Sequence, residues 1–285
     1  MPGWLEPVAA ATLQDGVPGE CGAAVVRREI LNGQWCPSTS TIQLRRLTVR
    51  QFSGEHLVAI AVMVVAATLG VWLARRYPGR TLTLVARGLA LVIIAGWAGE
   101  YIADAALGTW SVKYDLPLQL TDAVSVVSAL ALWTGRRRFV ELCYLWAMTA
   151  TLQAVLTPDL SHSFPNVYYF TYFMYHDGAV VGACLLVFGE RLYLQPGAVR
   201  RVYLTTLAWA CAAGVGDMIT GGNYMYLRKK PGHASLVSAL GSWPWYAVVT
   251  IVVIAPAFLF AAWGLAALVE RWDRIRALPQ RTRAV

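Results

Sequence analysis

Polar side chains that could act on a substrate gather toward one end of the long apolar segments of this chain. They comprise carboxylates, amides, a hydroxyl and an imidazole: Glu100, Asp104, Gln119, Thr121, Asp122, Gln153, His176, Asp177 and Asp217. At a rise of about 1.5 Å per helical residue, most of them fall in the same half of a membrane-spanning bundle. A charged side chain at mid-bilayer costs about 2.5–3.5 kcal/mol on insertion scales, so each of these residues needs a reason.

The helical spacing of these residues predicts that they face one another. Thr121 flanks the face of its predicted helix that carries Asp122 and Ser125. His176 belongs to a second face with helical spacing, formed by Tyr172, His176, Ala179 and Ala183. Five predicted helices place polar side chains in the same half of the membrane. This convergence predicts a polar cavity that opens toward the outer leaflet.

Each of these residues also has a purely structural interpretation. The Thr121 hydroxyl could bond a carbonyl one turn back, near Pro117, as threonine commonly does in membrane helices. His176 could join two helices through a hydrogen bond. Asp122 is the least easily explained by packing. No pair of His or Cys residues has the spacing of metal ligands, so we expect neither a metal site nor a cofactor.

The elements that must position these residues are apolar stretches long enough to cross a bilayer, which needs about 20 residues of helix. We place seven of them at 56–74, 82–103, 117–134, 139–156, 167–188, 202–220 and 245–269. Only helices or closed barrels satisfy every backbone group in lipid, and the alternation of barrel strands is missing here. The predicted fold is therefore an all-α, polytopic bundle of seven transmembrane helices.

The net charge of +8 reflects topology rather than binding to nucleic acid, because the basic residues are confined to loops. One set of loops holds 14 of them: Arg75, Arg76, Arg80, Arg136, Arg137, Arg138, Arg191, Arg200, Arg201, Arg271, Arg274, Arg276, Arg281 and Arg283. The opposite loops hold four, namely Lys113, Arg228, Lys229 and Lys230. The positive-inside rule then predicts an external N-terminus and a cytoplasmic C-terminus.

The remaining segments differ in composition from the spans. Residues 1–48 are rich in Gly, Pro, Ser and Thr without helical periodicity, and are expected to form a disordered extension. The seven-helix domain is expected at 49–270 and a basic cytoplasmic tail at 271–285. The connection 221–244 exceeds usual loop lengths, which favours a lid or re-entrant segment.

Several motifs follow one another in a specific order along the chain. They are Leu116-Pro117-Leu118-Gln119-Leu120-Thr121-Asp122, Leu152-Gln153, Leu156-Thr157-Pro158-Asp159-Leu160, His176-Asp177-Gly178, Asn223-Tyr224-Met225-Tyr226-Leu227-Arg228, Lys230-Pro231 and Trp243-Pro244-Trp245-Tyr246. On these motifs the chain resembles the bacterial YwaF-like conserved integral membrane proteins over about residues 50–268. Eukaryotic relatives of that family include an ether-phospholipid acyltransferase.

The resemblance implies lipid-acyl chemistry at two positions. In the acyltransferase relatives, a Cys in the motif corresponding to 116–122 is the nucleophile and a His further on assists it. This chain has Thr121 in place of that Cys, and Gln119 where the family often has His. A more distant group, the membrane lipid hydrolases of the androgen-induced-gene type, uses a Thr and a His. Thr121 and His176 look like that pair.

The expected function is a lipid acyl hydrolase or acyltransferase of the bacterial plasma membrane, with membrane lipids or an acyl ester as substrate. Thr121 would be the nucleophile and His176 its general base, with Asp217 or Asp122 orienting the imidazole. The expected substrate-binding residues are Gln119, Gln153, Asn223 and Tyr224. Thr121 lies about 7 Å and His176 about 13 Å below their helix starts, so contact requires helix tilt or a kink at Pro117.

The alternative is a non-catalytic membrane protein that transports or binds a small solute or a lipid. The same outward-facing cavity would then be its binding site. A broken helix in the second half of the chain would favour transport. The glycines Gly214, Gly216, Gly221 and Gly222 allow such a break.

Overall fold

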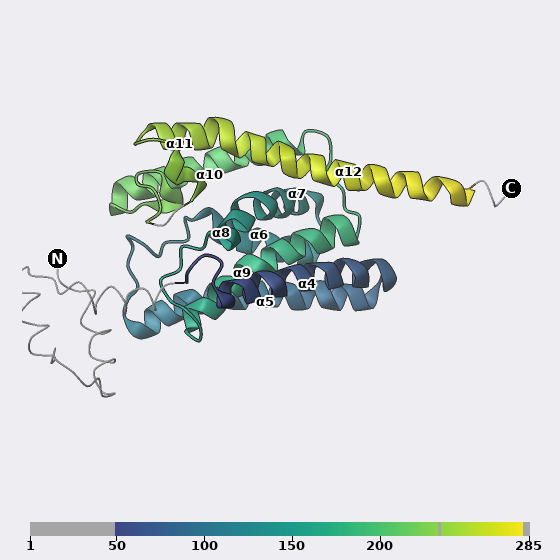
Figure 1. Ribbon diagram of the computed structural model, residues 1–285, viewed down its shortest axis with the longest axis horizontal. Helices are drawn as coiled ribbons and strands as arrows, with labels where there is room; N and C mark the ends of the chain where they lie inside the picture. Colours follow the sequence, from purple (N-terminus) through teal and green to yellow (C-terminus); the bar gives the residue numbers. More distant parts are fainter. Residues whose placement is uncertain (1–48, 233–234, 282–285) are drawn as a thin grey trace, which may run out of the picture. The chain divides into compact units, whose positions relative to one another are not determined.

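A computed structural model describes residues 49–232 and 235–281 (Figure 1). The predicted extension, 1–48, and the end of the predicted tail, 282–285, lie outside the described residues. Every regular element within the described ranges is helical. In chain order these elements are α4 (Gly54–Arg76), α5 (Arg80–Leu107), α6 (Leu120–Thr134), α7 (Arg137–Trp146), η1 (Ala147–Thr151), α8 (Leu152–Leu156), α9 (Val167–Cys184), η2 (Leu185–Gly189), α10 (Ala198–Thr220), η3 (Tyr224–Tyr226), η4 (Leu236–Ala239), α11 (Trp245–Val249), η5 (Thr250–Ile254) and α12 (Ala255–Arg281).

Six helical segments are long and apolar enough to cross a membrane, and a seventh is shorter. The six are Gly54–Arg76, Arg80–Leu107, Arg137–Leu156, Val167–Gly189, Ala198–Thr220 and Trp245–Ala277. The seventh, α6, has 15 residues, which is about 22 Å of helix. This architecture agrees with the predicted bundle of seven helices. Helix α12 continues through Arg281, so the predicted tail begins as helix.

Helix α9 forms the centre of the bundle. In its most apolar window 83% of residues are buried, against 17% for α10 and 11% for Trp245–Ala277. Figure 1 shows α9 between the α4–α5 pair and the α6–α8 segment, and it packs against both. Because α9 carries His176, the surrounding helices shield this imidazole from lipid.

Two glycines allow the closest helix approach, between α5 and α9. A Cβ on Gly96 would lie 2.7 Å from the Met174 side chain, and one on Gly178 would lie 2.7 Å from Ile93. The two backbones therefore meet without intervening side chains, and a larger residue at either position would push the helices apart. This contact holds the half of α5 that bears Glu100 and Asp104 against α9.

Prolines mark several helix boundaries, as the sequence suggests. Helix α8 ends at Leu156, shortly before Pro158. Helix α6 begins at Leu120, three residues later than predicted, so Pro117 precedes the helix instead of kinking it. In the last span, the π-helical turn Thr250–Ile254 immediately precedes Pro256 and the rest of α12.

The basic loops meet at one end of the bundle. Arg75 and Arg191 both pair with the Asp273 carboxylate, at N–O distances of 2.9 and 3.3 Å. On the neighbouring helices, Arg201 pairs with Glu141 at 2.7 Å. The loops that were grouped by their arginines are therefore brought together by ion pairs, and the polar residues of interest lie toward the other end.

A buried histidine joins the start of α4 to the end of α8. The side chain of His56 is fully buried, with its Nε2 2.7 Å from the Val155 carbonyl oxygen. A carbonyl only accepts, so Nε2 carries the proton, and Nδ1 accepts the Phe52 backbone N–H at 2.8 Å. One neutral tautomer satisfies both bonds.

Replacing His56 by alanine should lower the free energy of unfolding by about 2–4 kcal/mol. The change removes buried volume and leaves the Phe52 N–H and the Val155 carbonyl unpaired. Unfolding in detergent micelles, followed by circular dichroism, measures the loss. His162→Ala is the control, because this imidazole is only partly buried and stacks on Tyr168 alone. Equal losses from both variants would contradict the assigned role of His56.

Candidate functional site

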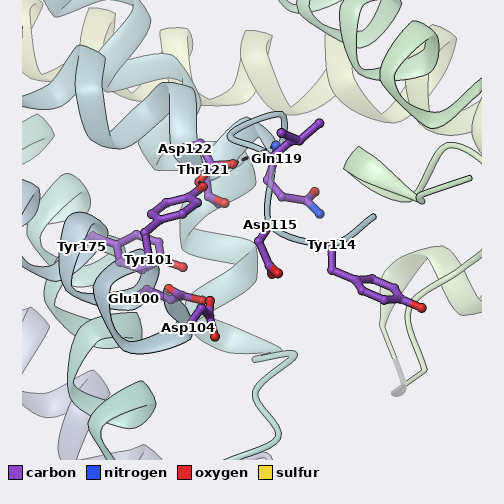
Figure 2. A pocket seen from close by; sticks show the side chains of 10 residues that line it. Glu100, Tyr101, Asp104, Tyr114, Asp115, Gln119, Thr121, Asp122 and Tyr175 are labelled. Atoms are coloured by element: carbon purple, nitrogen blue, oxygen red, sulfur yellow. Dashed lines mark hydrogen bonds between the residues drawn. The ribbon is translucent and has the colours of Figure 1, made fainter. Parts of the chain in front are cut away.

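A polar cavity of about 80 Å³ lies between α5, the start of α6 and the connection that joins them. Its walls are mostly carboxylates and tyrosines (Figure 2). The lining residues are Glu100, Tyr101, Asp104, Tyr114, Asp115, Leu116, Gln119, Thr121, Asp122 and Tyr175. The cavity therefore brings together three of the residues predicted for the site, namely Gln119, Thr121 and Asp122.

The first turn of α6 places Thr121 at the cavity. Gln119 is the N-cap residue, and its backbone N–H donates to the Asp122 carboxylate at 2.9 Å, as in a capping box. Thr121 is the second helical residue, in the turn whose backbone N–H groups have no partner within the helix. The positive end of the helix dipole therefore faces the part of the cavity beside the Thr121 hydroxyl.

The Asp122 carboxylate fixes α6 against α5. Its Oδ1 accepts hydrogen bonds from Trp97 Nε1 at 3.1 Å and from the Tyr101 hydroxyl at 3.0 Å. Its Oδ2 accepts the Gln119 N–H. The carboxylate of Asp122, a residue that is only 8% exposed, therefore accepts hydrogen bonds from three donors. Asp122 therefore holds the helix start in place beside Thr121.

The Thr121 hydroxyl is available for other contacts. It lines the cavity, and across residues 49–232 and 235–281 it has no hydrogen-bond partner. The bond to a carbonyl near Pro117, which the structural interpretation expected, does not form. Ser125 instead donates from its hydroxyl to the Thr121 carbonyl oxygen at 2.8 Å.

Two of the other cavity carboxylates, those of Asp104 and Asp115, each accept a hydrogen bond. The third, Glu100, lines the cavity together with Tyr175. Asp104 accepts the Tyr168 hydroxyl at 2.6 Å, and Asp115 accepts the Ser111 N–H at 2.7 Å. Burial raises the pKa of Asp115 above its ordinary value, with the Ser111 bond opposing the shift.

These carboxylates extend the predicted site. Glu100 and Asp104 stood out in the sequence as intramembrane charges, but neither was assigned to the site. Asp115 was missed because it precedes the helix and lies in a loop, where a carboxylate needs no special explanation. The only available signal was its closeness to Pro117 and Gln119 in the chain.

His176 is not among the residues that line the cavity. It is 2% exposed, and its Nδ1 is 2.9 Å from the Tyr172 carbonyl oxygen. The carbonyl requires a proton on Nδ1, which leaves Nε2 as the basic nitrogen. The imidazole stacks on Tyr172 and contacts Tyr175, with ring centroids 4.0 and 4.3 Å apart. Tyr175 also lines the cavity, so it contacts both the cavity and the imidazole.

The backbone carbonyl orients the imidazole, in place of the expected carboxylates. Asp122 bonds Trp97, Tyr101 and Gln119, as described above. Asp217 accepts the Tyr224 N–H at 2.6 Å through Oδ1, while its buried Oδ2 has no partner among the described residues. Neither carboxylate has a hydrogen bond to His176.

The loop after α10 supports the cavity from outside. The Tyr224 hydroxyl donates to the Val112 carbonyl oxygen at 2.6 Å and accepts the Leu116 N–H at 3.0 Å. The Gln119 side-chain oxygen accepts the Met225 N–H at 2.8 Å, which leaves the Gln119 amide group as a donor. These bonds hold the α5–α6 connection in place.

Three residues expected to bind substrate do not line the cavity. Asn223 bonds within its own loop, donating from its side-chain amide to the Lys229 carbonyl oxygen at 2.8 Å. Tyr224 supports the connection as described above. Gln153 donates to the Thr157 hydroxyl at 3.2 Å on its own helix. Among the described residues, no group of three or more His, Cys, Asp or Glu side chains has metal-binding geometry.

The model of the TMEM164 family matches residues 51–262, which is most of the chain. No curated protein matches the chain, and no solved structure does.

Proposed function

The chain belongs to the TMEM164 family of transmembrane proteins, and we propose that it is a lipid acyl hydrolase or acyltransferase with Thr121 as nucleophile. The observation that carries the proposal is the Thr121 hydroxyl. It has no hydrogen-bond partner in the described part of the chain, lines a polar cavity and sits in the first turn of a helix. The family assignment rests on the sequence match alone and does not depend on the proposed chemistry.

The reaction begins when the Thr121 oxygen attacks the carbonyl carbon of a lipid ester and His176 Nε2 takes the hydroxyl proton. The tetrahedral intermediate collapses, the ester C–O bond breaks, and the imidazolium returns the proton to the leaving alcohol. Water then cleaves the acyl-threonine in a hydrolase, whereas the hydroxyl of an acceptor lipid cleaves it in a transferase. Each route restores the free Thr121 hydroxyl.

The first turn of α6 suits the negative charge that develops on the carbonyl oxygen. The backbone N–H groups of Leu120 and Thr121 are unpaired within the helix, and the Gln119 amide is a further donor. The carboxylates on the opposite wall would repel an oxyanion. They suit a hydroxyl-bearing or cationic polar group of the substrate instead.

His176 is the proposed base because its Nδ1 bond leaves Nε2 unprotonated. Helix α6 packs against α9, and Tyr175, which lines the cavity, contacts the imidazole. His176 itself does not line the cavity, so the approach of its Nε2 to Thr121 requires this part of the site to rearrange when substrate enters. Glu100 is the competing base, since its carboxylate lines the same cavity.

The sequence resemblance supports the same assignment. Thr121 stands where YwaF-like relatives with acyltransferase activity have a nucleophilic Cys. The pairing of Thr121 with His176 resembles that of the Thr/His membrane lipid hydrolases. We assign the substrate to membrane lipids or another acyl ester, and assign no role to nucleic acid.

The cavity is proposed to open toward the external leaflet of the cell membrane. The arginine-rich loops meet at the opposite end of the bundle, where the positive-inside rule puts the cytoplasm.

A reporter fused after Arg283 should therefore read cytoplasmic, and one inserted after Gly232 should read external. Dual reporters, each active on one side of the membrane only, measure both positions. If both reporters read the same side, the number of spans between the two positions cannot be odd. If the Arg283 reporter reads external and the Gly232 reporter reads cytoplasmic, the orientation is the reverse of the one proposed.

The enzymatic proposal is tested by turnover. Purified protein in nanodiscs is supplied with long-chain esters and phospholipids, with and without a lysolipid acceptor, and products are followed by mass spectrometry. Released fatty acid supports a hydrolase, and acylated lysolipid supports a transferase. Absence of both products with every substrate would overturn the proposal.

A second function is favoured by the excess of carboxylates around the cavity. Glu100, Asp104, Asp115 and Asp122 line it without a Lys or Arg among the described lining residues. The same site would then bind or transport a small cationic solute or a lipid. Saturable binding of an organic cation in the absence of turnover, lost in Glu100→Gln, would favour this function.

A further inference from the structure

A second cavity, of about 240 Å³, lies along the same α5–α6 contact. All of its lining residues are apolar, in contrast to the first: Ala90, Leu91, Ile94, Val126, Ala129, Leu130 and Trp133. Several of these side chains are exposed on the bundle surface, including Leu91 and Trp133 at 61% and 51%. We call this cavity the α5–α6 groove.

The groove and the polar cavity follow one another along both helices. On α5 the groove residues end at Ile94, and the polar cavity begins at Glu100. On α6 the order is reversed, from Thr121 in the polar cavity to Trp133 in the groove. Trp97, whose indole N–H donates to the Asp122 carboxylate of the polar cavity, comes between Ile94 and Glu100 on α5. Polar and apolar sites therefore share one line of contact between two helices.

We propose that the α5–α6 groove binds the acyl chain of the lipid whose ester carbonyl meets Thr121, an inference that rests on the proposed function. The groove lies within membrane-spanning helices, where its occupant is hydrocarbon. Twelve residues of helix separate Thr121 from Trp133, or about 18 Å. One lipid chain covers about half of the roughly 30 Å hydrocarbon core, or about 15 Å, so a chain starting at Thr121 extends most of the way to Trp133.

Trp133 closes the inner end of the groove. The Arg87 guanidinium lies over its indole ring, 5.1 Å from the centroid. A cation held on the aromatic face makes this end polar and bulky, and so unfavourable for further methylene groups. Trp133 therefore sets the longest chain that the groove accepts.

Filling the groove should reduce turnover of long-chain esters more than that of short ones. Each buried methylene contributes about 0.8 kcal/mol, or roughly fourfold, so loss of two or more should cost at least about tenfold. Ala129→Phe and Val126→Trp each fill the groove, so one remains if the other fails to fold. Trp133→Ala should shift the preferred ester toward longer chains.

Matched controls lie on α4. Ala61→Phe enlarges an exposed alanine, and Trp72→Ala removes an exposed indole, in both cases away from the groove. Both should keep the wild-type chain-length profile. A chain-length profile that is unchanged in all groove variants would overturn the proposal that the acyl chain binds in the α5–α6 groove.

Crosslinking tests the groove without requiring turnover. Thr121→Val protein in nanodiscs is exposed to a long-chain ester that bears a diazirine near the chain end, irradiated, and mapped by peptide mass spectrometry. Crosslinks concentrated at 126–133 and removed by Ala129→Phe would support the groove. If the wild-type protein turns over no ester, the enzymatic function is rejected, and the same crosslinks would still support a site for a lipid acyl chain. Uniform labelling of all lipid-facing helices would indicate annular lipid only and overturn the inference.

Discussion

Replacing Thr121 by alanine should lower kcat/KM for a long-chain ester by at least about 10³-fold. The variant lacks the oxygen that forms the acyl-enzyme, and among the described residues no other hydroxyl lines the cavity except those of tyrosines. Thr121→Ser should retain measurable turnover, because it keeps the hydroxyl and loses only a methyl group. Thr121→Val keeps the shape of the side chain and should be as inactive as Thr121→Ala.

The effect of His176→Ala should be of similar size, since a hydroxyl of high pKa needs a base. Groups that act as a unit are not additive, so the double variant should be little worse than either single one. If Glu100→Gln alone removes turnover and His176→Ala does not, Glu100 is the base. Thr149→Ala is the control, because that hydroxyl already bonds the Leu145 carbonyl oxygen within its helix. Full activity of Thr121→Val would contradict the assignment of Thr121 as the nucleophile.

Replacing Asp122 by alanine should lower the free energy of unfolding by about 3–5 kcal/mol. The change leaves the Trp97 and Tyr101 donors without their acceptor and removes the cap from the start of α6. Activity should fall with stability, because Asp122 positions the turn that carries Thr121. Asp122→Asn, which keeps one acceptor oxygen, should give an intermediate loss.

Unfolding by sodium dodecyl sulfate in mixed micelles, followed by tryptophan fluorescence, measures these differences. Asp115→Asn is the matched control, since its carboxylate accepts a single hydrogen bond, from Ser111, and it should lose less than about 1 kcal/mol. An Asp122→Ala variant as stable as wild type would show that α6 is held to α5 by packing alone.

The spans could be predicted because bilayer thickness fixes both their length and their composition. Boundaries marked by proline were also accessible, as at Pro158. The start of α6 was not, because Pro117 can occupy a first turn or precede the helix. The choice depends on the bond from the Gln119 N–H to the Asp122 carboxylate, which becomes apparent only once the side chains are placed.

The candidate site could be predicted only in part. Spacing along one helix identifies Thr121 and Asp122 as neighbours, and the structure places both at one cavity. The partners of Asp122 on α5 depend on the rotation of α5, which the close approach at Gly96 sets. The same limitation applies to Asp217 and Asn223. Both residues form hydrogen bonds with the loop after α10, although their positions in the sequence were equally consistent with residues that line a cavity.

Covalent labelling distinguishes a nucleophilic Thr121 from an unreactive one. Protein in nanodiscs is treated with a long-chain fluorophosphonate, digested, and mapped by mass spectrometry, with Thr121→Val and His176→Ala in parallel. We expect one adduct on the peptide that contains Thr121, absent in Thr121→Val and formed much more slowly in His176→Ala. An unlabelled Thr121, in protein that still turns over a lipid ester, would contradict this expectation.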